Sequence, residues 1–175
     1  MEKLEADTAA FVRTLTTFPR PVIAAVEGAA IGGGLVLALA CDVIVAARDS
    51  RLSMPEVALG WFPPWGLHVL TRRVGPIVAR RLVWGAEPLE IATALECGLV
   101  DETAPSGHAL ARAGEIARDL ARLPADAVAT TKEFFARADA AAEEADARAL
   151  RLFMRDCTNS AEAQATLARF RKPKS

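Results

Sequence analysis

The sequence predicts a single α/β domain that continues into a helical C-terminal region. Two apolar runs of strand length, residues 22–26 and 42–47, flank an apolar segment that is entered through three consecutive glycines at 32–34. Apolar runs without a polar face are typical of strands covered on both sides, as in α/β proteins. Beyond residue 105, glycine and proline become rare and alanine, arginine and glutamate dominate, which favours helices.

The elements of the first part follow from apolar spacing and from the positions of proline and glycine. The first helix ends before Pro19, because proline lacks a backbone N–H and restricts the residue before it. Gly28 ends the first strand. In order, we expect a helix over 4–18, a strand over 22–26, a buried helix over 35–40, a strand over 42–47 and an extended piece over 51–54.

Prolines and glycines also delimit the elements that follow. Pro76 and Pro88 suit the first turn of a helix, and Gly75, Gly85 and Gly98 suit a helix end. We expect helices over 66–73, 76–84 and 88–97, a short strand over 99–102, helices over 106–123 and 125–138, and further helix beyond. The chain is thereby divided into residues 1–105 and a helical region, 106–175.

Charge and hydropathy exclude several classes of protein. The 175 residues include 21 Lys and Arg and 22 Asp and Glu, so no overall basic field attracts nucleic acid or anionic membrane. The longest apolar run, residues 31–40, is too short for a membrane span, which needs about 20 apolar residues. No apolar leader follows Met1. We therefore expect a cytoplasmic protein without nucleic-acid or membrane partners.

Metal-ligating residues are sparse. The three cysteines, Cys41, Cys97 and Cys157, are odd in number and far apart, which is typical of free buried thiols in a reducing compartment. Cysteine and histidine never cluster, so we expect no zinc site and no other bound metal.

The three glycines, Gly32, Gly33 and Gly34, are the first candidate site. Glycines between a buried strand and a helix let the backbone approach a ligand and expose N–H groups that stabilise an anion. Neither a Walker A loop nor a dinucleotide fingerprint fits the spacing. The alternative is tight packing of the helix on the strand.

Glu56 is the second candidate. It follows Pro55 in an apolar segment, residues 52–60, and partial burial there would raise the pKa of its carboxyl toward the range useful for proton transfer. The alternative is an ordinary glutamate in a surface loop.

Six blocks in order give the chain a specific resemblance. They are PVIAAVEG (21–28), AIGGG (30–34), CDVIVA (41–46), MPEVALG (54–60), LTRRVG (70–75) and ALECGLV (94–100). In these blocks the chain resembles the crotonase superfamily, the enoyl-CoA hydratase/isomerase family. The resemblance implies part of a ββα superhelix: residues 1–105 would be the C-terminal part of its core, and 106–175 a helical region that oligomerises and caps coenzyme A. By this resemblance we expect the family's N-terminal part to be missing from the given sequence.

The resemblance also implies a mechanism. Family members bind an acyl-CoA thioester and hold its carbonyl oxygen between two backbone N–H groups, which stabilises an enolate. Gly33 would supply one N–H, Gly32 and Gly34 would border the substrate, and Glu56 would be the acid or base. Coenzyme A then enters as part of the substrate, without a separate cofactor, and the assembly is expected to be a homotrimer or homohexamer.

Val36 departs from the family pattern. Hydratases of the family have a second glutamate at this position, and valine cannot accept a proton. A single carboxyl that takes a proton from one carbon and returns it to another suits double-bond isomerisation. The alternatives are a catalytically inactive oligomeric module, a truncated fragment, or a diverged decarboxylase or hydrolase.

The loop after Gly60 is the other local departure. Trp61 and Trp65 would shape an apolar acyl pocket, or pack in the core or between subunits. His68 would be a polar pocket residue or an extra acid or base, or simply a half-buried side chain. At the C-terminus, Lys172 and Lys174 would meet the phosphates of coenzyme A, or serve solubility alone.

Overall fold

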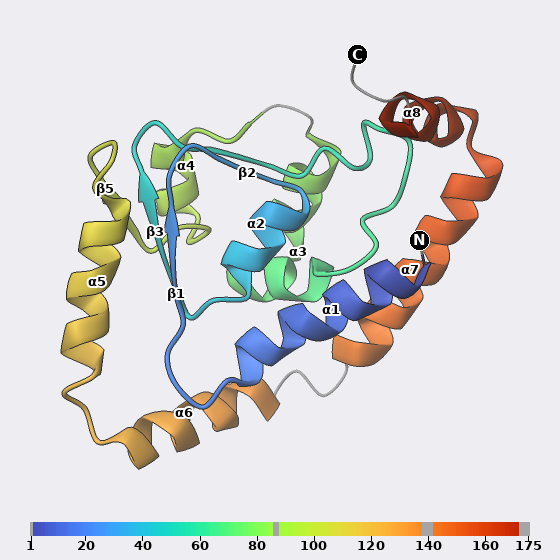
Figure 1. The fold of residues 1–175 in the computed structure, drawn as a ribbon. Helices are drawn as coiled ribbons and strands as arrows, with labels where there is room; N and C mark the ends of the chain where they lie inside the picture. The colour runs from blue at the N-terminus through green and yellow to red at the C-terminus, as the bar shows by residue number, and fades with distance from the viewer. Residues whose placement is uncertain (1, 86–87, 138–141, 172–175) are drawn as a thin grey trace.

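The computed structural model describes residues 2–85, 88–137 and 142–171 as eight helices and five strands (Figure 1). In chain order these are α1 (Glu2–Thr17), β1 (Ile23–Val26), β2 (Ala29–Ile31), α2 (Gly33–Leu39), β3 (Val43–Ala47), β4 (Arg51–Ser53), α3 (Leu67–Trp84), α4 (Ile91–Glu96), β5 (Glu102–Ala104), α5 (Ala109–Leu120), α6 (Ala125–Arg137), α7 (Ala142–Asn159) and α8 (Ala161–Arg171).

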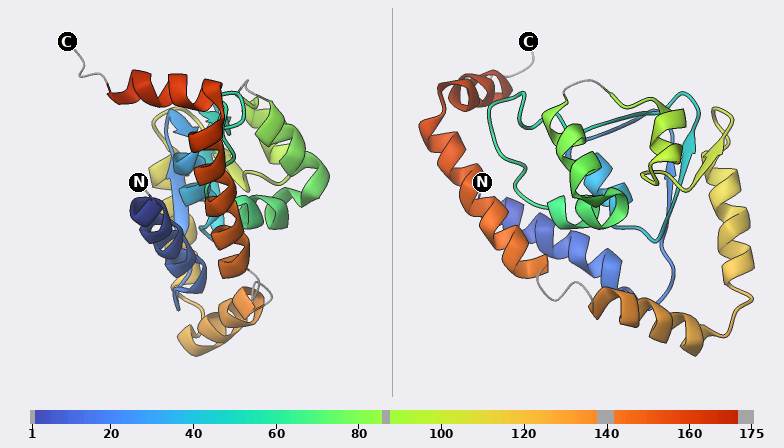
Figure 2. Two further views of the ribbon diagram at one scale, coloured as in Figure 1. Left: turned by 90° about the vertical axis from the view of Figure 1, so that its right-hand side faces the viewer. Right: turned by 180° about the vertical axis from the view of Figure 1, so that it is seen from behind.

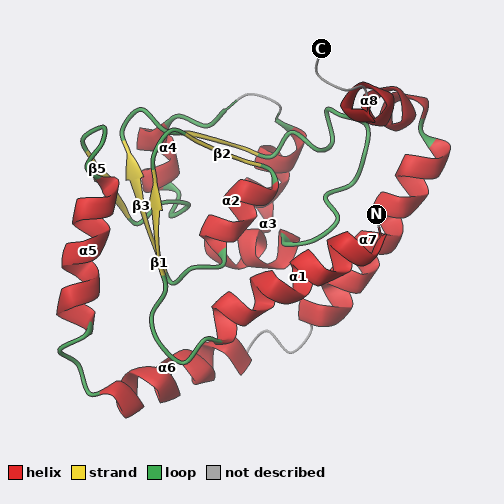
Figure 3. Ribbon diagram, in the orientation of Figure 1, coloured by secondary structure: helices red, strands yellow, loops and turns green. Residues whose placement is uncertain are grey.

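The strands form two small parallel sheets, ordered β1-β3-β5 and β2-β4 (Figure 3). Parallel pairing requires a crossover between partners, and α2 supplies the one that leads from β1 and β2 to β3 and β4. Helix α5 covers the first sheet through Ala109 and Ala113, which pack against Val45 and Ala47. The predicted α/β fold is confirmed. Strand β3 is covered as expected, whereas residues 23–25 of β1 are only half-buried.

The main core lies between the two sheets and helices α2 and α3. It includes the fully buried Leu35 of α2, Ile44 of β3, Leu52 of β4 and Leu70 of α3. Because β2, β4 and α2 all contribute to this core, the turn from β2 into α2 is held in a fixed position. That turn contains the three glycines.

Helices α5 to α8 run along the outside of the molecule in an arc (Figures 1 and 2). Helix α7 lies along α1 in these views, and Arg13 of α1 is hydrogen-bonded to Asp146 of α7 at 2.7 Å. Residues near the two ends of the sequence are thereby brought together.

Several predicted boundaries are confirmed and two are wrong. Helix α3 breaks at Gly75, whose φ of 73° is left-handed, so the two expected helices are present end to end. Residues 88–90 are not helical, because the Leu89 amide donates to the Leu52 carbonyl and α4 begins only at Ile91. The strand expected over 99–102 is β5, at 102–104, because the amides of residues 99 and 100 both donate to the Ala94 carbonyl at the end of α4.

Two further differences concern short or exposed features. Strand β2 was not expected, since its three residues follow the left-handed turn at Gly28 and have no alternation of their own. All three cysteines are free, as predicted, but only Cys157 is buried, whereas Cys41 and Cys97 are half-buried.

Candidate active site

The turn from β2 into α2 brings the glycine backbone close to Glu56. Gly32 has a left-handed φ of 55°, and its amide donates to the Ser53 carbonyl at 2.8 Å. A Cβ on Gly32 would lie 2.5 Å from Oε1 of Glu56, closer than real Cβ contacts come. A side chain at Gly32 would be strained by the backbone angle, and the Glu56 carboxyl would have to move to make room for it.

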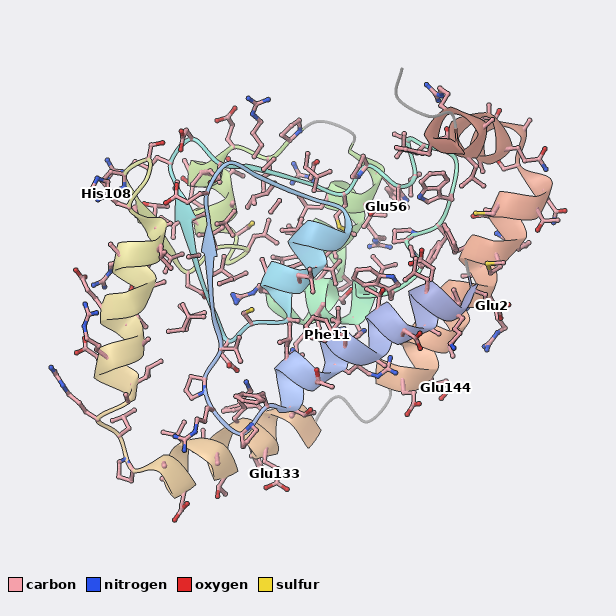
Figure 4. The ribbon with its side chains drawn as sticks, in the orientation of Figure 1. Glu2, Phe11, Glu56, His108, Glu133 and Glu144 are labelled. Atoms are coloured by element: carbon pink, nitrogen blue, oxygen red, sulfur yellow. The ribbon has the colours of Figure 1, made fainter. Side chains whose placement is uncertain are left out.

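Glu56 follows β4 and lies near the start of α2, whereas His108 lies at the edge of the molecule, by α5 (Figure 4). The Oε2 atom of Glu56 is buried and has no hydrogen-bond partner among the described residues. Burial raises the pKa of this carboxyl, and a backbone hydrogen bond opposes the rise only in part. The sequence prediction of a raised pKa therefore agrees with the structure.

A cavity of about 220 Å³ opens beside the three glycines and contains Glu56. Its lining residues are Glu5, Gly33, Val36, Pro55, Glu56, Leu59, Trp61, Pro64, Trp65 and Phe153. Among these described residues only Glu5 and Glu56 have titratable side chains. The arrangement is an apolar chamber with two carboxyl groups and a backbone turn in its wall, which is typical of a small-molecule site.

Trp65 forms one wall of this chamber and contacts Gly33. A Cβ on Gly33 would lie 3.0 Å from Cη2 of Trp65, so the indole ring rests on the middle glycine. At its other edge the indole Nε1 donates a hydrogen bond to Oε2 of Glu5 at 2.8 Å. Trp65 thus connects α1 with the start of α2.

Trp61 forms a second aromatic wall. Its ring meets that of Phe153 edge to face, with centroids 6.0 Å apart. Phe153 belongs to α7, so the helical region contributes to the chamber.

Helix α7 also holds the loop that presents the two tryptophans. The Phe62 amide donates to Oδ2 of Asp156 at 3.1 Å, and the Gly66 amide donates to Oδ1 of Asp146 at 3.1 Å. Hydrogen bonds to charged acceptors are stronger than neutral ones, and here they fix both ends of the loop.

His68 lies with Asp146, and it is not among the described residues that line the chamber. Its Nδ1 is 3.2 Å from Oδ1 of Asp146, whose Oδ2 accepts from Arg13 at 2.7 Å. Burial pushes the pKa of Asp146 upward, but the adjacent His68 and the hydrogen bonds from the Gly66 amide and Arg13 outweigh it and leave that pKa below its usual range.

Of the residues singled out in the sequence, Gly33, Glu56, Trp61 and Trp65 come together around one chamber. Gly34 lines a separate surface hollow beside β1 and α2. Lys172 and Lys174 lie outside the described residues.

Glu5 and Phe153 are lining residues that sequence reasoning did not find. Glu5 stands in a polar first turn of a helix, and the helix containing Phe153 reads as an ordinary amphipathic one. Only the packing of α1 and α7 around the loop brings them to Glu56.

The comparison with protein families decides the relationship. The family described as enoyl-CoA hydratase/isomerase matches residues 2–174. The chain belongs to the enoyl-CoA hydratase/isomerase family. The expected crotonase resemblance is thereby confirmed.

Curated members of this family match the central part of the chain. A probable enoyl-CoA hydratase of Bacillus subtilis is 46% identical over 87 residues, which cover 49% of this chain and 34% of that protein. A 2,3-dehydroadipyl-CoA hydratase of Escherichia coli is 40% identical over 109 residues, covering 62% of this chain and 43% of the relative. The chain spans less than half the length of these two relatives.

Solved structures of the enoyl-CoA hydratase/isomerase family share the fold. An enoyl-CoA hydratase from Mycobacterium avium subsp. paratuberculosis has a TM-score of 0.87 at 27% identity and is matched over 95% of this chain and 70% of its own. An enoyl-CoA hydratase from Mycobacterium smegmatis has a TM-score of 0.71 at 35% identity, over 78% and 65% of the two chains. In the part of the chain that the structure describes, no helix is long and apolar enough to cross a membrane.

Proposed function

We propose that this member of the enoyl-CoA hydratase/isomerase family moves a proton next to the carbonyl of an acyl-CoA thioester through an enolate. Glu56 is the group that takes and returns the proton, and the Gly33 N–H steadies the oxygen. The observation that carries the proposal is the chamber lined by both Gly33 and Glu56, a half-buried carboxyl with a raised pKa.

The Gly33 amide is available for this role. It belongs to the first residue of α2, where backbone N–H groups have no acceptor within the helix, and Gly32 has no side chain that could cap it. Removing one donor of this kind typically slows acyl chemistry by about 10²–10³-fold. A preorganised N–H at this position therefore contributes strongly to the rate of the reaction.

With Glu56 as the carboxyl at C2 of the substrate, the reaction moves a double bond from C3–C4 to C2–C3. The Glu56 carboxylate takes a proton from C2 of a 3-enoyl thioester, and the electron pair of that C–H bond moves onto the thioester oxygen. The Gly33 N–H donates to that oxygen. The proton then returns from Glu56 to C4, which leaves the double bond between C2 and C3.

The walls favour an apolar acyl group. Val36, Leu59, Trp61 and Trp65 line the chamber together with Glu56, whose pKa is raised by burial. A carboxyl kept partly out of water exchanges protons closer to neutral pH than an exposed glutamate does. We propose that coenzyme A enters only as part of this substrate, and that the protein works in the cytoplasm without a separate cofactor.

The experiment offers the purified chain a 3-enoyl-CoA and follows the absorbance of the conjugated product. We expect turnover by the wild type and a loss of at least about 100-fold in Glu56→Gln, which keeps the size of the side chain but cannot shuttle the proton. Glu96→Gln is the matched control, because Glu96 is an exposed glutamate on α4 outside the chamber.

Two outcomes would contradict the proposal. Turnover that survives in Glu56→Gln would remove Glu56 from the chemistry. Calorimetric titration without binding of any acyl-CoA would instead favour an inactive module of the same fold.

A further inference from the structure

We propose that Glu5 is a second carboxylate of the acyl site and that it receives the proton of a water added to a 2-enoyl thioester. The inference rests on the proposed function, because it uses the same chamber and the same enolate. Water addition is the reaction for which the family is named; the new element is its assignment to a residue of α1, in a chamber where Val36 stands at the place of the family's second glutamate.

Glu5 is held in place by the chamber wall. The indole N–H of Trp65 can only donate, so the Glu5 oxygen that faces it at 2.8 Å accepts. Among the described residues, Glu5 receives no second hydrogen bond, which leaves its other oxygen able to accept one from a water. Glu5 is half-buried and lines the chamber directly.

No other described residue that lines the chamber can accept the proton of the water. Val36 lines it with an apolar side chain, and Pro64 has no N–H to offer a water. Apart from Glu5, Glu56 is the only titratable lining residue among those described, and it has to deliver a proton to C2. A separate acceptor for the water proton is therefore required, and Glu5 fits.

There is also room for the reactants. A single water needs about 10–15 Å³ of cavity volume, a small part of the 220 Å³ of the chamber. A short acyl group beside Glu56 leaves space for a water next to Glu5.

Water adds across the C2–C3 double bond of the thioester. The water oxygen bonds to C3 of the 2-enoyl thioester, one O–H bond of the water breaks, and its proton passes to Glu5. The C2–C3 π electrons move toward the thioester oxygen as the enolate forms. The Glu56 carboxylic acid then protonates C2, which gives the 3-hydroxyacyl thioester. Loss of the Glu5 proton and uptake of one by Glu56 restore the site.

The test compares two reactions in each variant. Hydration of trans-2-butenoyl-CoA and isomerisation of trans-3-hexenoyl-CoA are measured by chromatography of the products. In Glu5→Gln we expect hydration to fall about 100-fold and isomerisation to fall much less, so that the ratio of hydration to isomerisation drops at least about tenfold. Glu2→Gln is the matched control, since Glu2 lies one turn earlier on the same helix and is exposed.

Trp65→Phe tests how Glu5 is positioned. Phenylalanine keeps an aromatic ring but lacks the indole N–H, so we expect hydration to fall about three- to tenfold, with less effect on isomerisation. Thermal unfolding of each variant shows whether the fold is retained.

The outcomes separate this inference from the proposed function. If the wild type isomerises but does not hydrate, or if Glu5→Gln lowers both reactions equally, Glu5 is not the acceptor of the water proton. If the wild type catalyses neither reaction, the proposed function fails, and this inference fails with it.

Discussion

Glu56 and Asp146 are two carboxyl groups whose pKa values shift in opposite directions. Burial dominates at Glu56, where one oxygen has no hydrogen-bond partner among the described residues. Asp146 is also buried, but His68, the Gly66 amide and Arg13 favour its charged form. The difference suits two roles, since a carboxyl with a raised pKa moves protons and one with a lowered pKa stays charged.

The raised pKa of Glu56 makes stability depend on pH. As pH rises above 4.5, the ordinary value, the unfolded chain loses the Glu56 proton while the folded chain still holds it. The free energy of unfolding therefore falls until the raised pKa is passed. We expect the wild type to lose stability relative to Glu56→Gln over this window, as measured by urea unfolding from about pH 4 to pH 8. A constant difference between the two proteins would contradict the raised pKa.

The lowered pKa of Asp146 makes stability change with pH in the opposite direction. The stability it contributes is present above its ordinary pKa of 3.8 and is lost as pH falls through the lower native value. We expect Asp146→Asn to lose about 2–3 kcal/mol at neutral pH, because Arg13 and the Gly66 amide lose a charged acceptor. Urea unfolding should show the loss shrinking below pH 3.8. Asp119→Asn, on the exposed surface of α5, is the control and should stay close to the wild type.

At the scale of elements, the outer helices position the loop that walls the chamber. Helix α7 holds the Phe62 and Gly66 amides, and the backbone of α8 lies against Gly60. Gly60 has a left-handed φ of 93°, and a Cβ there would come 2.7 Å from the Ala163 amide nitrogen. The helical region therefore shapes the site, although most of the chamber belongs to the first 65 residues.

Helix α6 is attached to the rest of the molecule by Lys132. Its Nζ donates to Oδ2 of Asp42 at 2.6 Å and to the carbonyls of Leu15 and Arg20 at 3.0 Å each. Only 8% of this side chain is exposed. Lys132→Met keeps the length but removes one donor from each of three acceptors, of which Asp42 Oδ2 keeps the Val22 amide, so we expect a loss of about 2–3 kcal/mol in urea unfolding. Lys3→Met, at an exposed position on α1, is the control. Equal stability of the two variants would contradict this role.

At the scale of the whole molecule, the outer helices carry exposed apolar side chains. Phe134 and Phe135 are 73% and 64% exposed, and Leu110 and Leu123 border an apolar groove between α5 and α6. Such surfaces are typical of subunit contacts. We expect a homotrimer or homohexamer, with a mass three or six times 18.6 kDa in light scattering. A monomer at micromolar concentration would contradict this expectation.

The sequence was sufficient for the parts of the site that are local in the chain. Gly33 lies in a glycine run between a strand and a helix, and Glu56 lies in an apolar segment, so each pattern indicated its environment. Glu5 and Phe153 could not be found in this way. Glu5 is 60 residues from Trp65, and their contact depends on how α1 packs against the loop.

In the fold, too, the features that depend on contacts between distant parts of the sequence could not be predicted. Proline and glycine marked most helix ends, including the break at Gly75, because they act on the local backbone. Strand β2 and the extended residues 88–90 depend on partners elsewhere, since β2 pairs with β4 and the Leu89 amide donates to Leu52. Pairing of this kind overrides local preference.

The central claim is that Glu56 and the Gly33 amide together stabilise an enolate of an acyl thioester. Its most direct test is the exchange of the C2 protons of butanoyl-CoA in D₂O, followed by proton NMR, because this reaction needs neither a double bond nor an added water. We predict exchange catalysed by the wild type and by Glu96→Gln, and exchange at least about 100-fold slower in Glu56→Gln. Exchange no faster than in buffer alone, or undiminished in Glu56→Gln, would contradict the claim.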